Sequence, residues 1–409
     1  MTRDEFFAEA RSDVRGPLDG LRVIEATTTW AGPMCGCLLA DFGADVVKVE
    51  LPGGEMARRA PPFLPGTDPP VSFMHATANR NKRSVCLDLR RPEGRAAFLR
   101  LAARADVVVE NFRPGTMTRY GLAYADVRAV RPDVVYVSIS GFGQWGPDAD
   151  RAGYDPLAQA ASGFLALNGH PDCEPVKAPT FLADDLAGLH AALATLAALR
   201  HRDRTGEGQH VDVALLDAML FQSTGFLTLG AMGAPLPRTG NEFRIAAPAR
   251  VYPCRDGSIM AGAVLDAHWR RLAERIGRPE LGGDPRYATT LARIERRAEV
   301  DRMLAEWLAP RTVAEAVAAL LDAGLPAAPV RTYAEAAADP HVRARDMLQW
   351  VAQEDGTQAP ITGPAAKLSR TPTRVRDGAP PLGAHTDAVL REAGLTSAEI
   401  ERLRRAGVA

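Results

Sequence analysis

Two adjacent aspartates, Asp184 and Asp185, open a long apolar segment and are well placed for covalent chemistry. The dipole and the unpaired backbone N–H groups at the start of a helix favour an anionic carboxylate, which suits a nucleophile. An Asp at this place is also a common helix cap, so spacing alone leaves both interpretations open. His190 lies further inside the same apolar segment, where a core or interface histidine is the better interpretation.

Two polar clusters could supply cations and hydrogen-bond donors to a ligand. Asn79–Ser84 leads into a predicted strand, and Asn111–Gly115 follows another. We expect both clusters at the ligand crevice of a sheet, with phosphate groups as partners. A solvated basic face is the alternative, and Phe112 fits either a stack on a purine or a place in the core.

Several common enzyme motifs do not occur in the sequence. Gly32 and Gly36 have the wrong spacing for G-x-G-x-x-G, which disfavours a nicotinamide enzyme. There is no P-loop, no H-E-x-x-H and no G-x-S-x-G. The five cysteines form no pattern with zinc spacing, so we expect no metal site and reduced thiols. Thiol catalysis by Cys35 or Cys37 is a weak alternative, because neither has a histidine partner in its motif.

Alternating strands and helices must position these residues. Strands are predicted at Leu21–Ala26, Val46–Glu50, Ser84–Leu89, Asp106–Glu110 and Val134–Ser140. Helices are predicted at Met34–Phe42, after a break at Gly32–Pro33, and at Pro92–Ala105 and Asp184–Arg202. The alternation predicts an α/β fold with an open, Rossmann-like parallel sheet, whose ligands bind beyond the carboxyl ends of the strands.

The length of 409 residues favours two substantial lobes. Glycines and prolines between residues 233 and 248 mark a loop-rich passage, where we place the crossing into the second lobe. That lobe mixes a strand at Ser258–Val264 with helices at His268–Ile276, Val300–Leu308 and Val313–Ala323, and Pro326–Pro329 is its expected exit. It is therefore predicted to be α+β.

Composition excludes some classes of partner. The chain carries 49 basic and 50 acidic side chains, which gives no reason to expect a nucleic-acid partner. The apolar run Leu189–Leu199 is shorter than a membrane span of about 20 residues, so no membrane span is expected. The N-terminus carries acids and no apolar core of a signal peptide, and we expect a cytoplasmic protein.

Short segments spread over nearly the whole chain carry a family resemblance. They are Pro17–Val23, Ala31–Pro33, Leu39–Glu50, Asn81–Ser84, Val109–Gly115, Gly153–Asp155 with Gln159–Ala160, Arg204–Gln209 and Leu382–Thr386. Through them the chain resembles the class III CoA-transferase family, also described as the formyl-CoA transferase and carnitine CoA-transferase family or the CaiB/BaiF type. The resemblance implies exchange of CoA between an acyl-CoA donor and a carboxylic acid acceptor, with CoA as a substrate and no permanently bound cofactor.

The same resemblance implies a domain organisation and an assembly. A large CoA-binding α/β domain would span residues 1–225 and be completed by a return segment, 331–409, around a small domain, 226–330. Two ring-like subunits would be interlocked as a homodimer.

Site residues are implied as well. The family nucleophile stands four residues before a helix glycine, a spacing that Asp184 satisfies with Gly188 and that Asp185 does not. The implied reaction passes through an aspartyl-CoA thioester. The residues expected to contact CoA are Trp30, Ala31, Leu87, Asp88, Arg90, Asn111, Phe112, Arg113, Arg119, Tyr154 and Asp155.

Two departures from the family pattern bear on the acid that is used. Some members that act on very short acids carry Gln in place of Trp30, and a glycine-only loop in place of Asn241–Ala247. Formyl or oxalyl transfer is therefore not expected. Arg244 or Arg250 could hold a second carboxylate or be an ordinary surface arginine. The donor and acceptor acids stay open, with succinyl-CoA as the hypothesised donor and a dicarboxylic or branched acid as the hypothesised acceptor.

Three other functions are alternatives to CoA transfer. An α-methylacyl-CoA racemase shares the fold, but its Gly-His-Asp triplet is Gly-Tyr-Asp here, and a phenol with a reference pKa of about 10 is a poor base. A catalytically silent acyl-CoA-binding protein is disfavoured by Asp184, Asn111 and the pair Lys82–Arg83. A dehydrogenase would be indicated by a bound flavin or nicotinamide.

Overall fold

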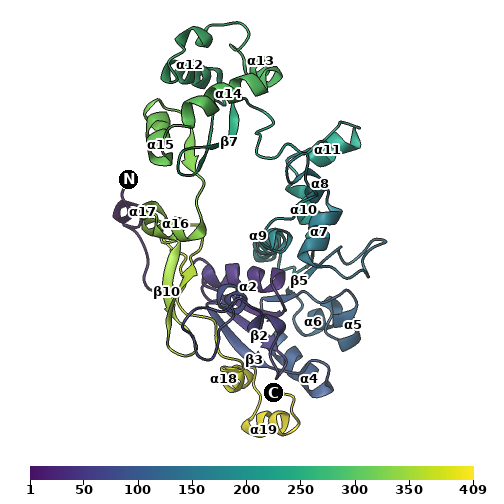
Figure 1. The fold of residues 1–409 in the computed structure, drawn as a ribbon. Helices are drawn as coiled ribbons and strands as arrows, with labels where there is room; N and C mark the ends of the chain where they lie inside the picture. The colour runs from purple at the N-terminus through teal and green to yellow at the C-terminus, as the bar shows by residue number, and fades with distance from the viewer. The chain divides into compact units, whose positions relative to one another are not determined.

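The computed structural model describes residues 1–409, and the chain divides into two compact units (Figure 1). Unit 1 comprises Met1–Phe164, Lys177–Met232 and His341–Ala409, and unit 2 comprises Leu165–Val176 and Gly233–Pro340. The domain limits inferred from the sequence remain a prediction. Nothing in the sequence pattern indicated that Leu165–Val176 groups with the second unit.

Unit 1 is built on a six-stranded, fully parallel sheet with the strand order β3-β2-β1-β4-β5-β6. The strands are β1 (Arg22–Ala26), β2 (Asp45–Glu50), β3 (Lys82–Cys86), β4 (Val107–Glu110), β5 (Val135–Ser140) and β6 (His210–Ala214). The order reverses between β1 and β4, so their carboxyl ends flank the crevice where doubly wound sheets bind ligands. The predicted α/β fold with a parallel sheet is confirmed.

Helices cover both faces of the sheet because the β-branched strand residues alternate between them. Ile24 and Val108 pack with Phe98 on one face, and Val23 and Val107 pack on the other. The first face is covered by α4 (Pro92–Ala102), α5 (Thr116–Tyr120), α6 (Tyr124–Val130), α18 (Thr386–Glu392) and α19 (Ser397–Arg405). The second is covered by α2 (Ala31–Asp41), α7 (Asp155–Ala161), α9 (Leu182–Thr205) and α10 (Leu215–Phe221).

Helix α2 starts earlier than the sequence pattern predicted. It begins at Ala31, so Gly32 and Pro33 lie in its first turn and do not separate it from β1. A proline is tolerated there because the N–H groups of the first turn have no partner within the helix. The turn into the helix is made by residues 27–30 instead.

Helix α9 is longer than predicted and is apolar on most of its surface. By length and composition its 24 residues could cross a membrane, and half of its most apolar window is buried inside the fold. It packs against α2 and α10. The passage after it, Val211–Leu229, is a strand followed by two helices, β6, α10 and α11 (Phe226–Ala231).

The C-terminal part of the chain returns to unit 1. It forms the antiparallel hairpin β10 (Leu348–Ala352) and β11 (Gln358–Thr362), and then α18 and α19 beside β3 and α4 (Figure 1). The His385 N–H donates to the Ser84 carbonyl over 2.9 Å, and Thr386 Oγ1 accepts from the Cys86 N–H over 3.1 Å. The motif Leu382–Thr386 therefore protects the open edge of the sheet at β3.

The remaining elements of unit 1 are short. They are α1 (Arg3–Phe6), the 3₁₀ turn η1 (Met56–Arg58) and α3 (Phe73–Ala78). Two further short helices, α8 (Phe164–Leu167) and α17 (Pro340–Ala344), stand where the chain passes from one unit to the other.

Unit 2 has its own antiparallel sheet and core. The sheet is formed by β7 (Ala249–Pro253), β8 (Ser258–Gly262) and β9 (Ala327–Pro329). The helical elements are α12 (Asp266–Arg275), η2 (Pro279–Gly282), α13 (Thr290–Glu295), α14 (Arg297–Leu308), α15 (Val313–Asp322) and α16 (Tyr333–Ala338). Trp269, Tyr252 and Leu304 are central to the core. The segment Pro326–Pro329, predicted as an exit, contains the third strand β9.

Candidate active site

A pocket of about 240 Å³ lies at the carboxyl ends of the central strands of unit 1. Its walls come from the turn after β1, the turn after β4, the end of β5, the segment around Tyr154 and the first turn of α9. The predicted site residues that line it are Trp30, Ala31, Asn111, Phe112, Arg113, Tyr154 and Asp184. The fold therefore brings together residues that are up to about 150 positions apart in the sequence.

Asn111 joins the turns that follow β1 and β4. Its Oδ1 accepts from the Thr28 N–H and its Nδ2 donates to the Thr28 carbonyl, both over 2.8 Å. An amide side chain supplies both a donor and an acceptor, which a carboxylate or a lysine could not do. Gly32 allows the contact, since a Cβ there would come within 2.8 Å of Asn111 Cγ.

Asp184 is the third residue of α9, and the helix is preceded by Phe181 without a side-chain cap. The interpretation of Asp184 as a helix cap is therefore wrong. Its side chain is only 9% exposed, and burial together with the nearby Asp155 and Asp185 raises its pKa to about 7. The carboxylate accepts no hydrogen bond from the protein and faces the pocket, where it is available to a ligand.

Asp155 does not line the pocket, although it was expected to contact CoA beside the thioester. Its Oδ1 accepts from the Ala183 N–H and its Oδ2 from Gln159 Nε2, both over 2.7 Å. Gln159 in turn accepts from the Ala178 N–H over 2.8 Å. Asp155 thus holds the first turn of α9 next to Asp184, and its structural place is that of a positioning residue.

The carboxylate of Asp185 is hydrogen-bonded to a tryptophan. Trp30 Nε1 donates to Asp185 Oδ1 over 2.6 Å, and the Trp30 ring lies 5.3 Å from the Phe181 ring and 6.3 Å from the Phe73 ring. Trp30 is therefore fixed as one aromatic wall of the pocket. The two adjacent carboxylates differ in environment, because only that of Asp184 is without a hydrogen-bond partner.

The glycine four residues after Asp184 has a steric reason. A Cβ on Gly188 would lie 2.9 Å from the Ala31 carbonyl oxygen and 3.0 Å from Met34 Cβ. Only glycine lets α9 approach the start of α2 this closely, which brings Ala31 and Asp184 to one pocket. The opposite wall has a similar contact, because a Cβ on Gly153 would lie 2.2 Å from Gly141 Cα.

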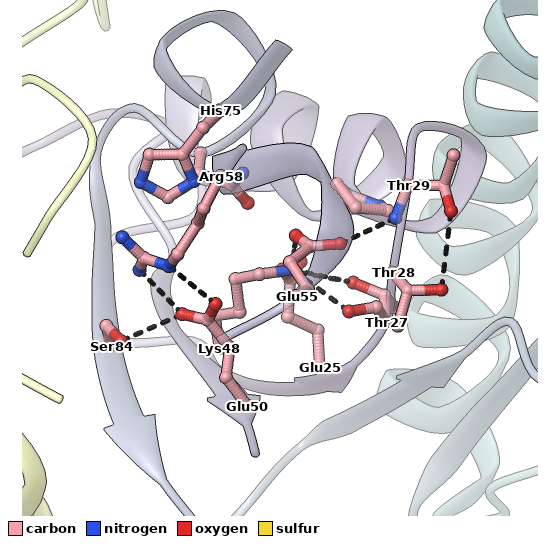
Figure 2. A network of polar contacts seen from close by, with 12 residues as sticks. Glu25, Thr27, Thr28, Thr29, Lys48, Glu50, Glu55, Arg58, His75 and Ser84 are labelled. Carbon is pink, nitrogen blue, oxygen red and sulfur yellow. Dashed lines mark hydrogen bonds and ion pairs between the residues drawn. The ribbon is translucent and has the colours of Figure 1, made fainter. Parts of the chain in front are cut away.

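A buried network of charges holds the turn after β1 (Figure 2). Lys48 Nζ lies 2.9 Å from Glu55 Oε1 and 3.4 Å from Glu25 Oε1, and it donates to the Thr27 carbonyl over 3.0 Å. Burial alone would lower the pKa of Lys48, but Glu55, Glu25 and Glu50 outweigh it and raise the pKa. The Lys48 ammonium is therefore charged inside the core.

Glu55 connects this network to the pocket. Its Oε2 accepts from the Thr29 N–H over 2.6 Å, and Thr29 has a φ of 68°, a left-handed conformation that β-branched residues rarely adopt (Figure 2). Such a conformation persists only where the surroundings impose it. Lys48 and Glu55 therefore determine the path of the chain directly before Trp30.

The cluster Asn79–Ser84 does not lie at the ligand crevice, so the prediction that placed it there is wrong. Residues that lead into β3 lie at its amino end, on the opposite edge of a parallel sheet from the crevice. Lys82 is buried and pairs with Glu25 Oε1 over 2.8 Å. Arg80 pairs with Asp41, and Arg83 with Asp45 and Glu392. The pair Lys82–Arg83 has a structural role and is no argument for turnover.

Besides Asp155, four more predicted contact residues lie beyond the pocket. Leu87 is a core residue, and Asp88 pairs with Arg90 over 2.7 Å. Arg119 donates to Thr116 Oγ1 over 2.9 Å, and both arginines are exposed. Their predicted contacts with CoA stay a prediction.

Some pocket residues were not anticipated. Ser140 and Gly141 end β5, and Leu215 follows β6. These residues were missed because strand β6 was not predicted. As a half-exposed edge strand, β6 has a sequence pattern that is hard to distinguish from the apolar run after it. Recognising that strand would have placed Leu215 at the same edge of the sheet as Asn111.

Comparisons with known proteins match nearly the whole chain. Residues 18–386 match the family model described as CoA-transferase family III. The chain is 40% identical over 385 residues to a succinate–glutarate CoA-transferase of Agrobacterium fabrum, covering 92% of this chain and 95% of that protein. It is 38% identical over 400 residues to a succinyl-CoA–D-citramalate CoA-transferase of Chloroflexus aurantiacus, with coverage of 95% and 97%.

Solved structures show the same fold. A CaiB/BaiF family protein from Brucella suis superimposes with a TM-score of 0.82 at 37% identity, over 93% of this chain and all of that one. The protein Rv3272 from M. tuberculosis superimposes with a TM-score of 0.83 at 33% identity, over 92% of this chain and all of that one.

Proposed function

The chain belongs to CoA-transferase family III, and we propose that it moves CoA from succinyl-CoA to a small dicarboxylic acid with Asp184 as the nucleophile. One observation carries the choice of Asp184. Its carboxylate is the one in the pocket that accepts no hydrogen bond from the protein. The neighbouring Asp185 is held by Trp30, and Asp155 is held by the first turn of α9.

The proposed reaction has two symmetrical halves. The Asp184 carboxylate attacks the thioester carbonyl of the donor, which forms a mixed anhydride and releases the CoA thiolate. The thiolate attacks the aspartyl carbonyl, which forms an aspartyl-CoA thioester and releases the donor acid. The acceptor carboxylate attacks this thioester to give a second anhydride, and the thiolate then attacks the acceptor acyl carbon. Asp184 is restored and no redox change occurs.

The pocket residues would activate Asp184 and hold the acyl-CoA substrate. Burial strengthens the nucleophile, because a poorly solvated carboxylate is less stabilised than one in water. Trp30, Ala31 and Tyr154 would enclose the acyl group and the end of the pantetheine chain. Asn111, Phe112 and Arg113 would lie along it, and the exposed Arg119 would meet phosphate groups. Leu87, Asp88 and Arg90 would lie near the adenine and ribose.

The acids are proposed from the relatives. The Agrobacterium and Chloroflexus proteins are named for succinate or succinyl-CoA together with glutarate or D-citramalate. A third relative, from Haloarcula hispanica, is 39% identical over 388 residues and is named a succinyl-CoA:mesaconate CoA-transferase. Succinate or its CoA thioester is common to these names, each time with a second small dicarboxylic acid, which supports succinyl-CoA as donor and a small dicarboxylic acid as acceptor.

An exchange assay tests the proposed function. Purified protein incubated with succinyl-CoA and glutarate, citramalate or mesaconate should form the matching acyl-CoA and an equal amount of succinate, followed by chromatography. Free CoA should not accumulate, because the thiolate stays bound between the two halves. Uptake of solvent deuterium at the α-carbon of a 2-methylacyl-CoA, without any acyl exchange, would instead indicate a racemase.

We further propose a homodimer. Leu189 and Leu193 of α9 are 53% and 62% exposed, and Phe221 of α10 is 75% exposed. The ring of His190, on the same helix as the two leucines, lies 5.0 Å from that of Phe221, and its Nε2 is buried without a partner. Large apolar side chains gathered on one face of a core helix support a contact with a second subunit.

Replacing Leu193 with aspartate should weaken this contact. A carboxylate in an apolar interface loses its hydration without gaining a partner, so we expect the mass in solution to fall from that of a dimer toward that of a monomer. Light scattering coupled to size exclusion measures it. Val130→Asp, on a partly exposed residue of α6, is the matched control and should leave the mass unchanged. A wild-type protein with the mass of one chain would refute the dimer.

A cytoplasmic location is proposed as well. Cys35, Cys37 and Cys86 are buried free thiols, and none of the five cysteines is in a disulfide. Such thiols are typical of a reducing compartment.

A further inference from the structure

Unit 2 contains a second pocket, of about 510 Å³, between β7 and α14. Its charged lining consists of Arg250 from β7, Arg297, Asp301 and Arg302 from α14, and Glu242 from the loop before β7. Three arginines face two acids, which gives a formal charge of 3 − 2 = +1. The pocket therefore favours an anion.

Two of these arginines have buried nitrogen atoms without a partner. The Arg250 side chain makes no hydrogen bond or ion pair, and its Nε is fully buried. Arg297 donates from Nη2 to the Phe243 carbonyl over 3.0 Å and lies 3.6 Å from Glu242 through Nε, but its Nη1 is buried and unpaired. A buried donor that lacks an acceptor is destabilising, so these two N–H groups lack an acceptor that a ligand would supply.

The acids of the pocket do not provide that acceptor. Asp301 accepts from the Tyr252 hydroxyl over 2.7 Å, and burial raises the pKa of Asp301 despite that bond. Glu242 is directed to Arg297 Nε. The free positive groups are thus on Arg250 and on one edge of Arg297, on facing elements of the pocket.

We propose that this pocket binds a small dicarboxylic acid, with carboxylate oxygens accepting from Arg250 Nε and Arg297 Nη1. A guanidinium presents a planar set of donors that matches a carboxylate, which makes arginine the preferred side chain for this anion. The choice of a dicarboxylic acid over other anions rests on the proposed function. The sequence had left Arg250 open between a carboxylate ligand and an ordinary surface arginine.

Direct binding tests the proposal without any turnover. Succinate and glutarate are titrated into the protein in the absence of CoA and followed by calorimetry. Arg250→Gln should weaken the binding of both acids at least tenfold, and Arg250→Lys should weaken it less. Butyrate should bind wild type at least tenfold more weakly than glutarate. Arg275→Gln, on an arginine outside the pocket that pairs with Asp322, is the control and should bind as wild type.

A second ligand distinguishes binding of a carboxylate from binding of the phosphate groups of CoA. This ligand is adenosine 3′,5′-bisphosphate, which carries phosphate groups like those of CoA. Equal affinity of wild type and Arg250→Gln for the dicarboxylic acids would overturn the proposal. The proposal would also be overturned if Arg250→Gln lost binding of the bisphosphate but kept binding of the dicarboxylic acids. Thermal melting of each variant confirms that it is folded. If the wild-type protein transfers no CoA but Arg250→Gln still binds the dicarboxylic acids more weakly than wild type, the proposed binding site is supported and the proposed function is contradicted.

Discussion

Asp184→Ala is expected to abolish CoA exchange, with kcat lowered by at least about 10³-fold, because no other carboxylate in the pocket is free to attack the thioester. Intact-protein mass after incubation with succinyl-CoA should show an adduct of the mass of CoA less one water in wild type and none in this variant. Hydroxylamine should convert the adduct to a hydroxamate on residue 184. Chromatography of the acyl-CoA products measures the exchange in parallel.

Asp185→Ala is the matched control. Its carboxylate holds Trp30 and does not face the reaction, so the variant should keep the adduct and lose only part of its activity. An adduct and normal exchange in Asp184→Ala would contradict the mechanism and direct attention to Asp185 and Tyr154.

The same residue sets the expected pH dependence. The nucleophile must be ionised, and its pKa is raised to about 7, so kcat/KM should fall about tenfold per pH unit below 7 and level off above it. Since the folded protein binds this proton more tightly than the unfolded chain, the ionised carboxylate destabilises the fold above pH 7. Asp184→Asn should therefore unfold at pH 8 with a free energy about 1 kcal/mol or more above that of wild type. An inactive but stabilised variant separates lost chemistry from lost folding.

Much of the fold could be predicted because it is encoded locally. Five strands of the parallel sheet are β-branched runs between helices, and each was predicted within a few residues of its position. Strand β6 was missed, because its edge position leaves it half exposed. The place of Leu165–Val176 in unit 2 depends on contacts distant in sequence, which no local pattern expresses.

The site was predicted unevenly for a related reason. Asp184, Asn111 and Trp30 follow strands or open a helix, so topology alone brings them to one edge of the sheet. Lys82 and Asp155 are residue types that often bind ligands. In this protein, however, Lys82 forms an ion pair with Glu25, and Asp155 accepts a hydrogen bond from the Ala183 N–H. A buried charged side chain needs a partner of opposite charge or a hydrogen-bond partner. The sequence shows the charged residue, but only the folded structure shows whether its partner is a ligand or another part of the protein.

Lys48→Met should be the most destabilising single change among the charged residues. Lys48 is fully buried, and its removal would leave Glu55 without its cation in the core. Breaking a buried ion pair by removing one partner typically costs about 3–5 kcal/mol, and we expect a loss of this size in the free energy of unfolding measured with urea. Arg405→Met, which breaks an exposed pair with Glu401, is the control and should leave the urea midpoint unchanged.

A second variant distinguishes the lost charge pair from lost packing. In Lys48→Met/Glu55→Gln the orphaned carboxylate becomes a neutral amide, so part of the lost stability should return. Stability equal to that of Lys48→Met alone would show that packing, and not the pair, was responsible. The double variant should still transfer CoA poorly, because Thr29 would lack the charged acceptor that holds its left-handed conformation beside Trp30. The buried network would then be shown to serve the geometry of the pocket separately from the stability of the sheet beneath it.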